Sequence, residues 1–438
     1  MTTTSQSLNR AQWRMIVLAS LGGALEFYDF IVYGIFSREI AAAFFPATDP
    51  LVSLILTFSV FTIGYMARPV GGIVLSHFGD KYGRRNVFVL SVLVISISTF
   101  AMGLIPTYAN WGVAAPALLI ALRLVQGFCL GGELPGAITY VVETSPSRAC
   151  FVCGFVFFCV QSGVVLASLI SLGVHTLLAP ADVAAWGWRI GFLFGGVTGL
   201  GSYLLQRTLE ETPEFKVMKQ NASAARRPFA EVFQKHTGAV LAGVAAIAVV
   251  GCFNGLLFAH MPAYLSTVLH YDPRTANVAQ NVCLAADAVF ILIAGWLGDR
   301  MSKTTLLQIG AAALALGAWP FYQAVVAKSE NVILLFGLFG IAAGLPSGTF
   351  ACILADLFPT RIRFTGVALA FNISFTIFSG TAPLVATSLI KSTSAAAGPA
   401  IFLIVCAVLA LAGSLFTSRL GGQIQGSSPG SMSRQEIG

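Results

Sequence analysis

Long apolar runs constrain this chain more than any other feature of its sequence. A hydrocarbon layer of about 30 Å is crossed by about 20 helical residues. Hydrophobic residues fill 56% of the 438 positions, charged residues only 10%, and twelve runs are long enough to cross, near 15–44, 51–76, 87–106, 112–142, 151–178, 187–206, 238–268, 276–297, 305–327, 332–355, 365–390 and 399–418. Lipid offers backbone groups no partner, and the runs are too long for barrel strands. We therefore predict an all-α polytopic membrane protein with twelve transmembrane helices.

A short charged turn appears once in each half of the chain. The first copy, GDKYGRR, occupies 79–85, and a diverged second copy, GDRMSKT, occupies 298–304. Each lies between two apolar runs, where glycine permits a tight turn and basic side chains favour the lipid headgroups. The repetition indicates two six-helix pseudo-repeats. In proteins built this way, the ligand site lies near the membrane midplane between the repeats.

With twelve spans, both ends of the chain lie on the same side of the membrane. The loops on that side carry most of the lysine and arginine, and loops rich in these residues stay cytoplasmic. We therefore expect both termini to be cytoplasmic. The expected order is a cytoplasmic N-terminal segment at 1–14, an N-terminal six-helix bundle at 15–207, a cytoplasmic central loop at 208–236, a C-terminal six-helix bundle at 237–418 and a disordered cytoplasmic tail at 419–438.

Several other classes of protein are disfavoured by the sequence. The net charge of +7 is explained by the loop asymmetry and by anionic headgroups, so we expect membrane lipids and no nucleic acid as partners. The eight cysteines are scattered through apolar runs without further ligands nearby, so we expect buried thiols and no metal site. No nucleophile with a base and no phosphate loop is apparent, so we expect no enzyme. A cleaved signal peptide is not expected either.

Ionisable side chains inside the predicted spans mark the candidate site. A charge at the bilayer centre costs at least about 2.5 kcal/mol and is retained where it faces a cavity or a partner. Glu26 and Asp29 share one face of the first span, and Arg123 and Glu133 belong to the fourth. We favour an Asp29–Arg123 pair, because protonation of the carboxylate would free the arginine and couple a proton to a solute. A static bridge between spans is the alternative.

The second half contains fewer polar groups. Asp287 is its acid at mid-depth, either a second proton site or a member of a local bridge, and His260 is expected at the outer surface. Aromatic side chains are expected to pack or to face lipid. The residues expected to take part in proton coupling are Asp29, Glu26, Arg123, Glu133 and Asp287. Those expected to bind substrate are Arg68, Arg123, Tyr33, Gln126, Gln161, Asn254 and Asn372.

Several motifs together resemble the major facilitator superfamily and, within it, the metabolite:proton symporters. They are GALEFYDF at 23–30, RPVGG at 68–72, the turn at 79–85, R-x-x-QG at 123–127, GGE at 131–133, WGWR at 186–189, EETP at 210–213 and FPTRIR at 358–363. The resemblance covers almost the whole chain and implies the major facilitator fold. It also implies a conformational latch at the two repeated turns, formed by Gly79, Asp80, Gly83, Arg84, Arg85, Asp299 and Arg300.

The resemblance implies a symporter that imports a small polar metabolite with a proton by alternating access. It also implies a monomer in a bacterial inner membrane, driven by the proton gradient without a cofactor. Arg123 resembles the citrate-like branch, because the osmolyte branch has lysine there, so we expect a di- or tricarboxylate as substrate. The segment 261–266 resembles the osmolyte branch, so a proline or betaine symporter is an alternative, as is a symporter of a bulkier carboxylate or siderophore. Proton-coupled export is a further one.

Overall fold

The structure is a computed structural model that describes residues 10–82, 84–207 and 228–426. Within these ranges the regular elements are helices and no strand occurs. The all-α prediction is therefore confirmed, and its physical reason is that a helix satisfies its own backbone hydrogen bonds within lipid.

In the described part of the first half, 10–82 and 84–207, helices occupy the six predicted spans and shorter helices connect them. Its elements are α1 (Arg10–Ile35), α2 (Ser37–Phe44), α3 (Pro50–Tyr82), α4 (Arg84–Leu104), α5 (Tyr108–Trp111), α6 (Ala114–Leu130), α7 (Glu133–Thr144), η1 (Pro146–Arg148), α8 (Ala149–Leu177), α9 (Pro180–Asp182), η2 (Val183–Gly187) and α10 (Arg189–Gln206).

The second half, 228–426, repeats this plan. Its elements are α12 (Pro228–Lys235), α13 (Thr237–Ala246), α14 (Ala248–Asn254), η3 (Gly255–His260), α15 (Met261–Ala263), η4 (Tyr264–Val268), α16 (Pro273–Gly298), α17 (Lys303–Val326), α18 (Val332–Asp356), η5 (Thr360–Ile362), α19 (Arg363–Ser374), η6 (Phe375–Gly380), α20 (Ala382–Thr393) and α21 (Pro399–Gly426).

All twelve predicted spans correspond to helical segments. Over the described ranges, nine segments are long and apolar enough to cross a membrane. The other three predicted spans, the first, third and sixth, are occupied by α1, α4 and α10. This agreement follows from the length of the apolar runs, because a run of about 20 apolar residues is most stable as a helix across the hydrocarbon layer.

The boundaries differ from the predictions in three places. α1 begins at Arg10, inside the segment assigned to the N-terminal extension, and breaks from α2 at Phe36. The central loop predicted at 208–236 contains the helix α12, and its residues 208–227 lie outside the described ranges. α21 continues to Gly426, so the disorder predicted from 419 onward is wrong for its first part.

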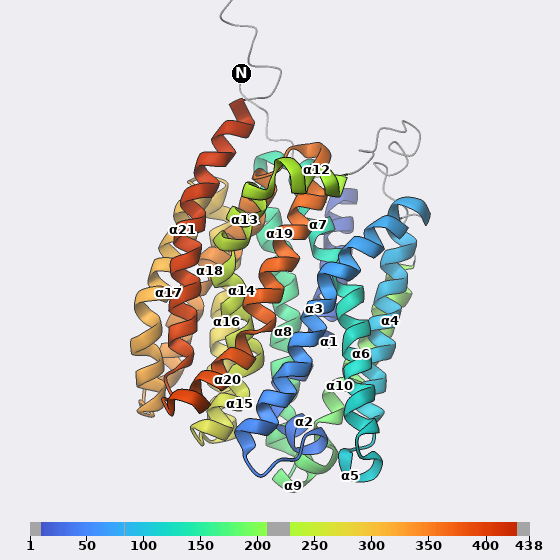
Figure 1. Ribbon diagram of the computed structural model, residues 1–438, viewed down its shortest axis with the longest axis vertical. Coiled ribbons are helices and arrows are strands. Elements are labelled where there is room, and N and C mark those ends of the chain that lie inside the picture. Colours follow the sequence, from blue (N-terminus) through green and yellow to red (C-terminus); the bar gives the residue numbers. More distant parts are fainter. Residues whose placement is uncertain (1–9, 83, 208–227, 427–438) are drawn as a thin grey trace, which may run out of the picture.

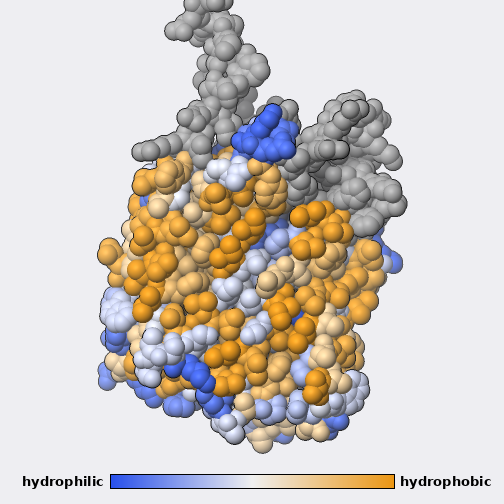
Figure 2. Space-filling view, in the orientation of Figure 1, coloured by the Kyte–Doolittle hydropathy of each residue, from blue (hydrophilic) through white to orange (hydrophobic). Residues whose placement is uncertain are grey.

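Figure 1 shows the spans running roughly side by side along the long axis of the molecule. α1 begins and α21 ends at one end of the bundle, near α12, and we call this end the terminal face. α2, α5, α9 and α15 lie at the other end, which we call the distal face. In Figure 2, hydrophobic residues cover most of the side of the bundle and hydrophilic ones gather toward its ends. This is the surface expected of a protein surrounded by lipid.

π-helical turns interrupt two spans of the second half. η3 and η4 lie in the seventh span, and η6 lies in the eleventh between α19 and α20. Such turns occur often at functional sites, because they re-aim side chains within a helix. Asn254 precedes η3 directly and Phe375 begins η6, and both residues belong to the cavity described below.

Direct contacts join the two halves at the terminal face. Arg363 Nη1 lies 3.2 Å from Glu143 Oε1. The carboxylate of Asp299, which follows α16, accepts hydrogen bonds from the backbone N–H groups of Cys150 and Phe151 at 2.9 and 3.0 Å. These groups begin α8, so an acid from the second half occupies a helix N-terminus of the first, where negative charge is favourable.

Further contacts join the halves at the distal face and between the two faces. Lys391 Nζ donates to Asp49 Oδ2 at 2.7 Å at the distal face. Deeper in the interface, Thr62 Oγ1 donates to Gly380 O at 2.7 Å. Ser379 Oγ donates to the Tyr65 hydroxyl at 3.0 Å. The halves are therefore held together at both faces in this conformation.

Candidate functional site

A cavity lies between the two halves, and we call it the interface cavity. The first half contributes residues from α1, α7 and α8, and the second contributes residues from α14, α16, α18, α19 and η6. Its lining consists of Phe27, Leu134, Phe157, Val160, Gln161, Val250, Asn254, Asp287, Ile291, Ser347, Phe350, Phe371 and Phe375. A site shared by two halves of this kind changes its access when one half rocks against the other.

Two polar atoms of the lining make no hydrogen bond to any described residue. They are Oδ1 of Asp287 and Nε2 of Gln161. Asp287 is 2% exposed and Gln161 is 4% exposed. A buried polar group without a partner costs about 1–3 kcal/mol, and a charged one costs more. An acceptor and a donor of this kind, facing one cavity from opposite halves, are suited to a ligand that supplies the missing partners.

Asn254 is another polar residue of the cavity lining. Its Nδ2 donates to the backbone oxygen of Val250 at 2.7 Å within its own span. The sequence placed both Asn254 and Gln161 among the expected substrate-binding residues, and both line the interface cavity. Asn372 does not: its Nδ2 donates to Gly131 O at 2.7 Å, which fastens α19 to the first half.

Five phenylalanines form much of the cavity wall. Phe157 and Phe350 come from opposite halves, with ring centroids 4.7 Å apart in an edge-to-face arrangement. Phe371 and Phe375 stack at 4.3 Å. Most aromatic side chains were expected to pack or to face lipid, and these rings do pack against one another, but they also line the cavity. The signal in the sequence was weak, because phenylalanine is common throughout the spans.

Arg68 lies beside this wall and is fully buried. Its guanidinium carbon is 5.1 Å from the centre of the Tyr65 ring, 5.6 Å from that of Phe371 and 6.0 Å from that of Phe375. None of its three side-chain nitrogens makes a hydrogen bond to a described residue. Aromatic faces stabilise such a cation, but a permanent charge with no acid beside it among the described side chains remains available to an anionic group.

Arg123 does not pair directly with Asp29, so that prediction is wrong for this conformation. Its guanidinium carbon lies 4.3 Å from the Phe30 ring centre and 4.4 Å from that of Tyr33. Nη1 donates to Phe30 O at 3.1 Å and to Gln126 Oε1 at 2.8 Å. Tyr33 and Gln126 therefore hold Arg123 within the first half. None of these three residues lines the interface cavity.

Asp29 points into the packing of the first half instead. Its side chain is 1% exposed and lies beside the Thr99 hydroxyl on α4. A Cβ atom added at Gly195 would lie 2.5 Å from Oδ1, and one added at Gly199 would lie 3.1 Å from Oδ2. Only glycine lets α10 approach the carboxylate so closely.

Gln126 connects the two charges indirectly. Its Oε1 accepts from Arg123, and its Nε2 donates to Thr99 Oγ1 at 2.7 Å and to Asp29 O at 3.3 Å. A chain of polar groups therefore runs from Arg123 through Gln126 to Thr99, whose hydroxyl donates to Ile95 O at 3.0 Å and lies beside the Asp29 carboxylate. Such networks transmit a change of charge at one end to the groups at the other.

Two further predicted proton-coupling residues have different settings. Glu133 begins α7 and is partly buried. Its Oε1 would lie 3.9 Å from a Cβ added at Gly23, so it faces α1. Glu26 belongs to α1, but its side chain lies outside the described part of the structure.

The predicted latch is only partly described. The side chains of its first copy lie outside the described part, namely Gly79, Asp80, Gly83, Arg84 and Arg85. In the second copy, Asp299 joins the halves as described above. Arg300 does not cross between them: its Nη1 donates to Trp296 O at 3.0 Å, and its guanidinium lies 3.8 Å from the Trp296 ring centre.

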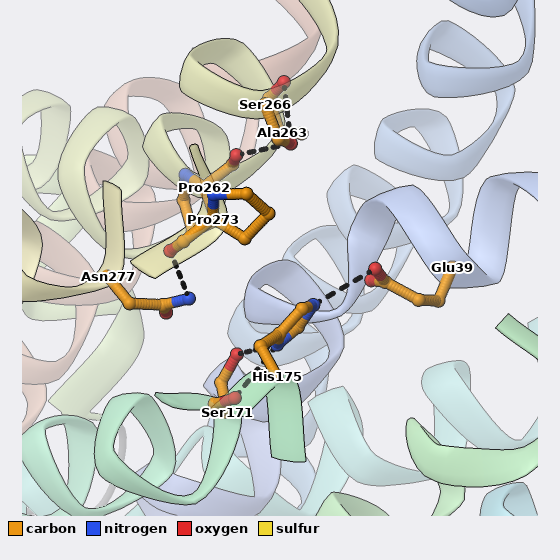
Figure 3. A network of polar contacts seen from close by, with 8 residues as sticks. All are labelled: Glu39, Ser171, His175, Pro262, Ala263, Ser266, Pro273 and Asn277. Carbon is orange, nitrogen blue, oxygen red and sulfur yellow. Dashed lines mark hydrogen bonds and ion pairs between the residues drawn. The ribbon is translucent and has the colours of Figure 1, made fainter. Parts of the chain in front are cut away.

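The distal face holds polar groups that the sequence analysis did not select. Figure 3 shows His175 of α8 between Ser171 and Glu39 of α2. His175 Nε2 is 3.4 Å from Glu39 Oε1, and its Nδ1 is 2.8 Å from Ser171 O.

His260 is buried at 1% exposure and stacks on Tyr264 at 5.4 Å, so its expected surface position is wrong.

A helical bundle of two similar halves, with an apolar outer surface and a largely aromatic cavity that holds a few polar groups between the halves, is typical of a membrane transporter. The chain matches the Major Facilitator Superfamily over residues 19–371. It therefore belongs to that superfamily, and the resemblance found in the sequence motifs is confirmed.

Curated relatives are similar over almost the whole chain. The glycine betaine/proline/ectoine/pipecolic acid transporter OusA of Dickeya dadantii (strain 3937) is 34% identical, over 95% of this chain and 85% of the relative. The proline/betaine transporter of Escherichia coli (strain K12) is 33% identical, over 97% of this chain and 87% of the relative.

Solved structures of the superfamily share the fold. A D-xylose-proton symporter superposes with a TM-score of 0.71 at 17% identity, over 93% of this chain and 97% of that one. The xylose transporter XylE from E. coli, in a partially occluded inward open conformation, gives a TM-score of 0.72 at 16% identity, with the same coverage. At this level of identity the comparison concerns the fold alone.

Proposed function

We propose that this protein is a proton-coupled importer of a compact zwitterionic osmolyte, of the proline or betaine kind. The names of the relatives support this class of substrate over the di- or tricarboxylate that the sequence analysis favoured. Proline and betaine carry one positive and one negative charge each, so their net charge near neutral pH is zero.

The charge of the interface cavity is the observation that carries the proposal. Among the described residues of its lining, Asp287 is the one ionisable side chain. A di- or tricarboxylate would bring two or three negative charges close to this acid, and Arg68 beyond the wall could offset only one. Like charges in a site of low dielectric repel strongly. A zwitterion instead offers a cation to Asp287 and a carboxylate to Gln161 and Arg68.

Proton coupling is assigned to Asp29, with Arg123 acting on it through Gln126 and Thr99. A carboxylate buried within a membrane bundle is retained where its charge is used. Protonation of Asp29 changes the charge at one end of the chain of polar groups, and Arg123 at the other end packs against α1 and α3. The proton gradient serves as the energy source, and no cofactor is required.

Orientation and location follow from the distribution of basic residues. The terminal face is the cytoplasmic one, since described segments at this face carry Lys235, Arg300, Lys303 and Arg363. A monomer in a bacterial inner membrane fits this arrangement. The ligand would then enter from the distal face and leave at the terminal face.

Uptake into proteoliposomes under an inward proton gradient tests the proposal. The panel is labelled glycine betaine, proline, citrate, 2-oxoglutarate and shikimate. Saturable uptake of betaine or proline that stops when the gradient is collapsed supports it. Uptake of citrate in place of the zwitterions overturns the substrate class. Efflux of substrate driven by the same gradient, without uptake, overturns the proposed direction of transport.

A further inference from the structure

We propose that Asp287, Phe157 and Phe350 form the subsite for the positively charged nitrogen of the ligand, whether a quaternary ammonium or a protonated amine. This inference rests on the proposed function and adds to it the part of the cavity that holds each end of the zwitterion. The three residues lie on α16, α8 and α18, which pack against one another along the interface.

Asp287 supplies the negative charge of this subsite. Its side chain is 2% exposed and Oδ1 lacks a partner among the described residues. α18 approaches it closely, because a Cβ added at Gly344 would lie 3.0 Å from the Asp287 backbone oxygen. Removal of a charge from water is costly unless an opposite charge replaces the water. A cationic ligand provides that charge when it binds.

Phe157 and Phe350 supply the aromatic surface. Their edge-to-face pair spans the two halves, with planes 62° apart, so rings of two orientations face the cavity. A quaternary ammonium has no N–H to donate, and it is recognised by aromatic faces together with a carboxylate. Phe371 and Phe375 are less suited, because the Arg68 guanidinium already lies 5.6 and 6.0 Å from their centres.

Another part of the cavity lining suits the ligand carboxylate. Gln161 Nε2 is an unpaired donor among the described residues and comes from the first half, while Arg68 provides positive charge behind Phe371 and Phe375. The cation then binds mainly to the second half and the carboxylate to the first. A zwitterion of the right length therefore bridges the halves, which explains why its binding would favour closure around the cavity.

A pair of ligands of equal shape tests the subsite in the unmodified protein. Glycine betaine and 3,3-dimethylbutanoate differ in one atom, a quaternary nitrogen replaced by carbon, so the second has lost the positive charge. Both are used as competitors of labelled betaine exchange in proteoliposomes without a pH gradient. The subsite requires 3,3-dimethylbutanoate to compete about thirtyfold more weakly or worse, which is typical of an unpaired buried charge. Equal competition overturns it.

Asp287→Asn distinguishes cation binding from proton carriage. The side chains have nearly the same shape, and Asn removes the charge. We expect the affinity for betaine in exchange to fall about thirtyfold or more, while that for the anion 3,3-dimethylbutanoate does not fall, because asparagine removes the unpaired charge. Unchanged exchange with loss of pH-driven accumulation alone would make Asp287 a proton carrier and would overturn the inference.

Phe350→Leu tests the aromatic contribution, with Phe339→Leu as its matched control. Both rings belong to α18, and Phe339 stacks on Phe321 at 4.0 Å outside the cavity lining. Loss of a desolvated cation–π contact weakens betaine binding by about tenfold, while Phe339→Leu leaves it within a few-fold. Equal effects of the two variants count against the subsite.

The subsite and the proposed function can fail separately. If wild-type protein takes up betaine or proline, but the isosteric competitor, Asp287→Asn and Phe350→Leu give the contrary results above, the proposed function stands and the subsite is wrong. If the wild-type protein takes up citrate and neither zwitterion, the proposed function fails, and the subsite fails with it.

Discussion

Asp49 and Lys391 form an ion pair across the distal face, with 2.7 Å between Oδ2 and Nζ. Asp49 precedes α3 and Lys391 lies near the end of α20, so the pair joins the two halves. Because both side chains are well exposed, the contribution of the pair to closure is small. We expect Lys391→Gln to increase the population open at the distal face by at most a few-fold.

Distances between spin labels placed on α2 and α20 measure this change. Lys328→Gln is the matched control, because Lys328 also lies at the distal face but contacts Tyr271 and His270 O within its own half. A loss of distal closure equal in both variants would exclude a specific role for the ion pair.

The same pair predicts how distal closure depends on pH. The hydrogen bond from Lys391, aided by the backbone N–H of Leu51, lowers the pKa of Asp49 below its ordinary value. A group with a lowered pKa contributes its full stabilisation above its ordinary pKa, near 4, and loses it only as the pH falls through the lowered value. Distal closure through this pair is therefore expected to be unchanged between pH 8 and pH 5. A change in that range that Lys391→Gln abolishes would contradict this.

Asp299 provides the corresponding contact at the terminal face. Substitution by alanine removes the acceptor for two backbone N–H groups at the start of α8. The loss of such a cap is worth about 1 kcal/mol, so we expect the ratio of terminal-face open to closed molecules to rise about fivefold. Solvent labelling of a cysteine introduced on the α8 side of this contact measures it.

Asp272→Ala is the control for Asp299→Ala. Asp272 also caps a helix, by accepting from Thr275 N at 3.1 Å, but it does so within the second half. Its loss is expected to lower thermal stability without opening the terminal face. An equal opening in both variants would mean that general destabilisation, and not the contact between halves, is the cause.

The spans could be predicted from the sequence because their cause is local. A run of about 20 apolar residues forms a transmembrane helix, and each predicted span coincides with a helical segment. The errors lie where local information is weak. The break at Phe36 and the extension of α21 to Gly426 depend on tertiary contacts or on marginal helix propensity, neither of which appears as a change in hydropathy.

The site could be predicted only in part, because its residues meet through tertiary structure. Spacing placed Glu26 and Asp29 on one face of α1, but it could not tell which helix that face meets. Gly195 and Gly199 carried a signal, since small residues one turn apart permit close helix packing, and they are the residues beside Asp29. The contact of Arg68 with Phe371 and Phe375 joins segments far apart in sequence, and no local pattern predicts it.

Two cysteine pairs allow the movement of the halves to be tested without new cysteines. The thiols of Cys150 and Cys352 are in contact, and these residues lie on α8 and α18, in different halves. Cys252 and Cys406 are also in contact, but both belong to the second half. A diazene dicarboxamide oxidant takes two electrons and two protons from a thiol pair and leaves a disulfide.

In a variant that keeps only Cys150 and Cys352, we expect this oxidant to abolish transport, and a thiol reductant to restore it. The physical reason is that the disulfide fixes the terminal face closed. In a variant that keeps only Cys252 and Cys406, transport is expected to remain after oxidation. Transport that continues at full rate with a proven Cys150–Cys352 disulfide would contradict rocking of the two halves.

The chain of polar groups from Asp29 to Arg123 gives the most informative prediction for coupling. Asp29→Asn removes the titratable group, and Gln126→Leu keeps that group but breaks its link to Arg123, because leucine cannot bond to Thr99. In both variants we expect exchange of the substrate to persist and accumulation under a pH gradient to be lost. With a gradient of one pH unit and one proton per substrate, the wild-type protein accumulates its substrate up to about tenfold, and the variants only equilibrate it.

Thr198→Val is the control, because Thr198 lies on α10 beside Gly199 but bonds only to the backbone of its own helix. Suppose that the Gln126→Leu variant accumulates substrate as the wild type does, while the Asp29→Asn variant does not. Asp29 then acts without Arg123, and the coupling must run through α4 or α10 instead.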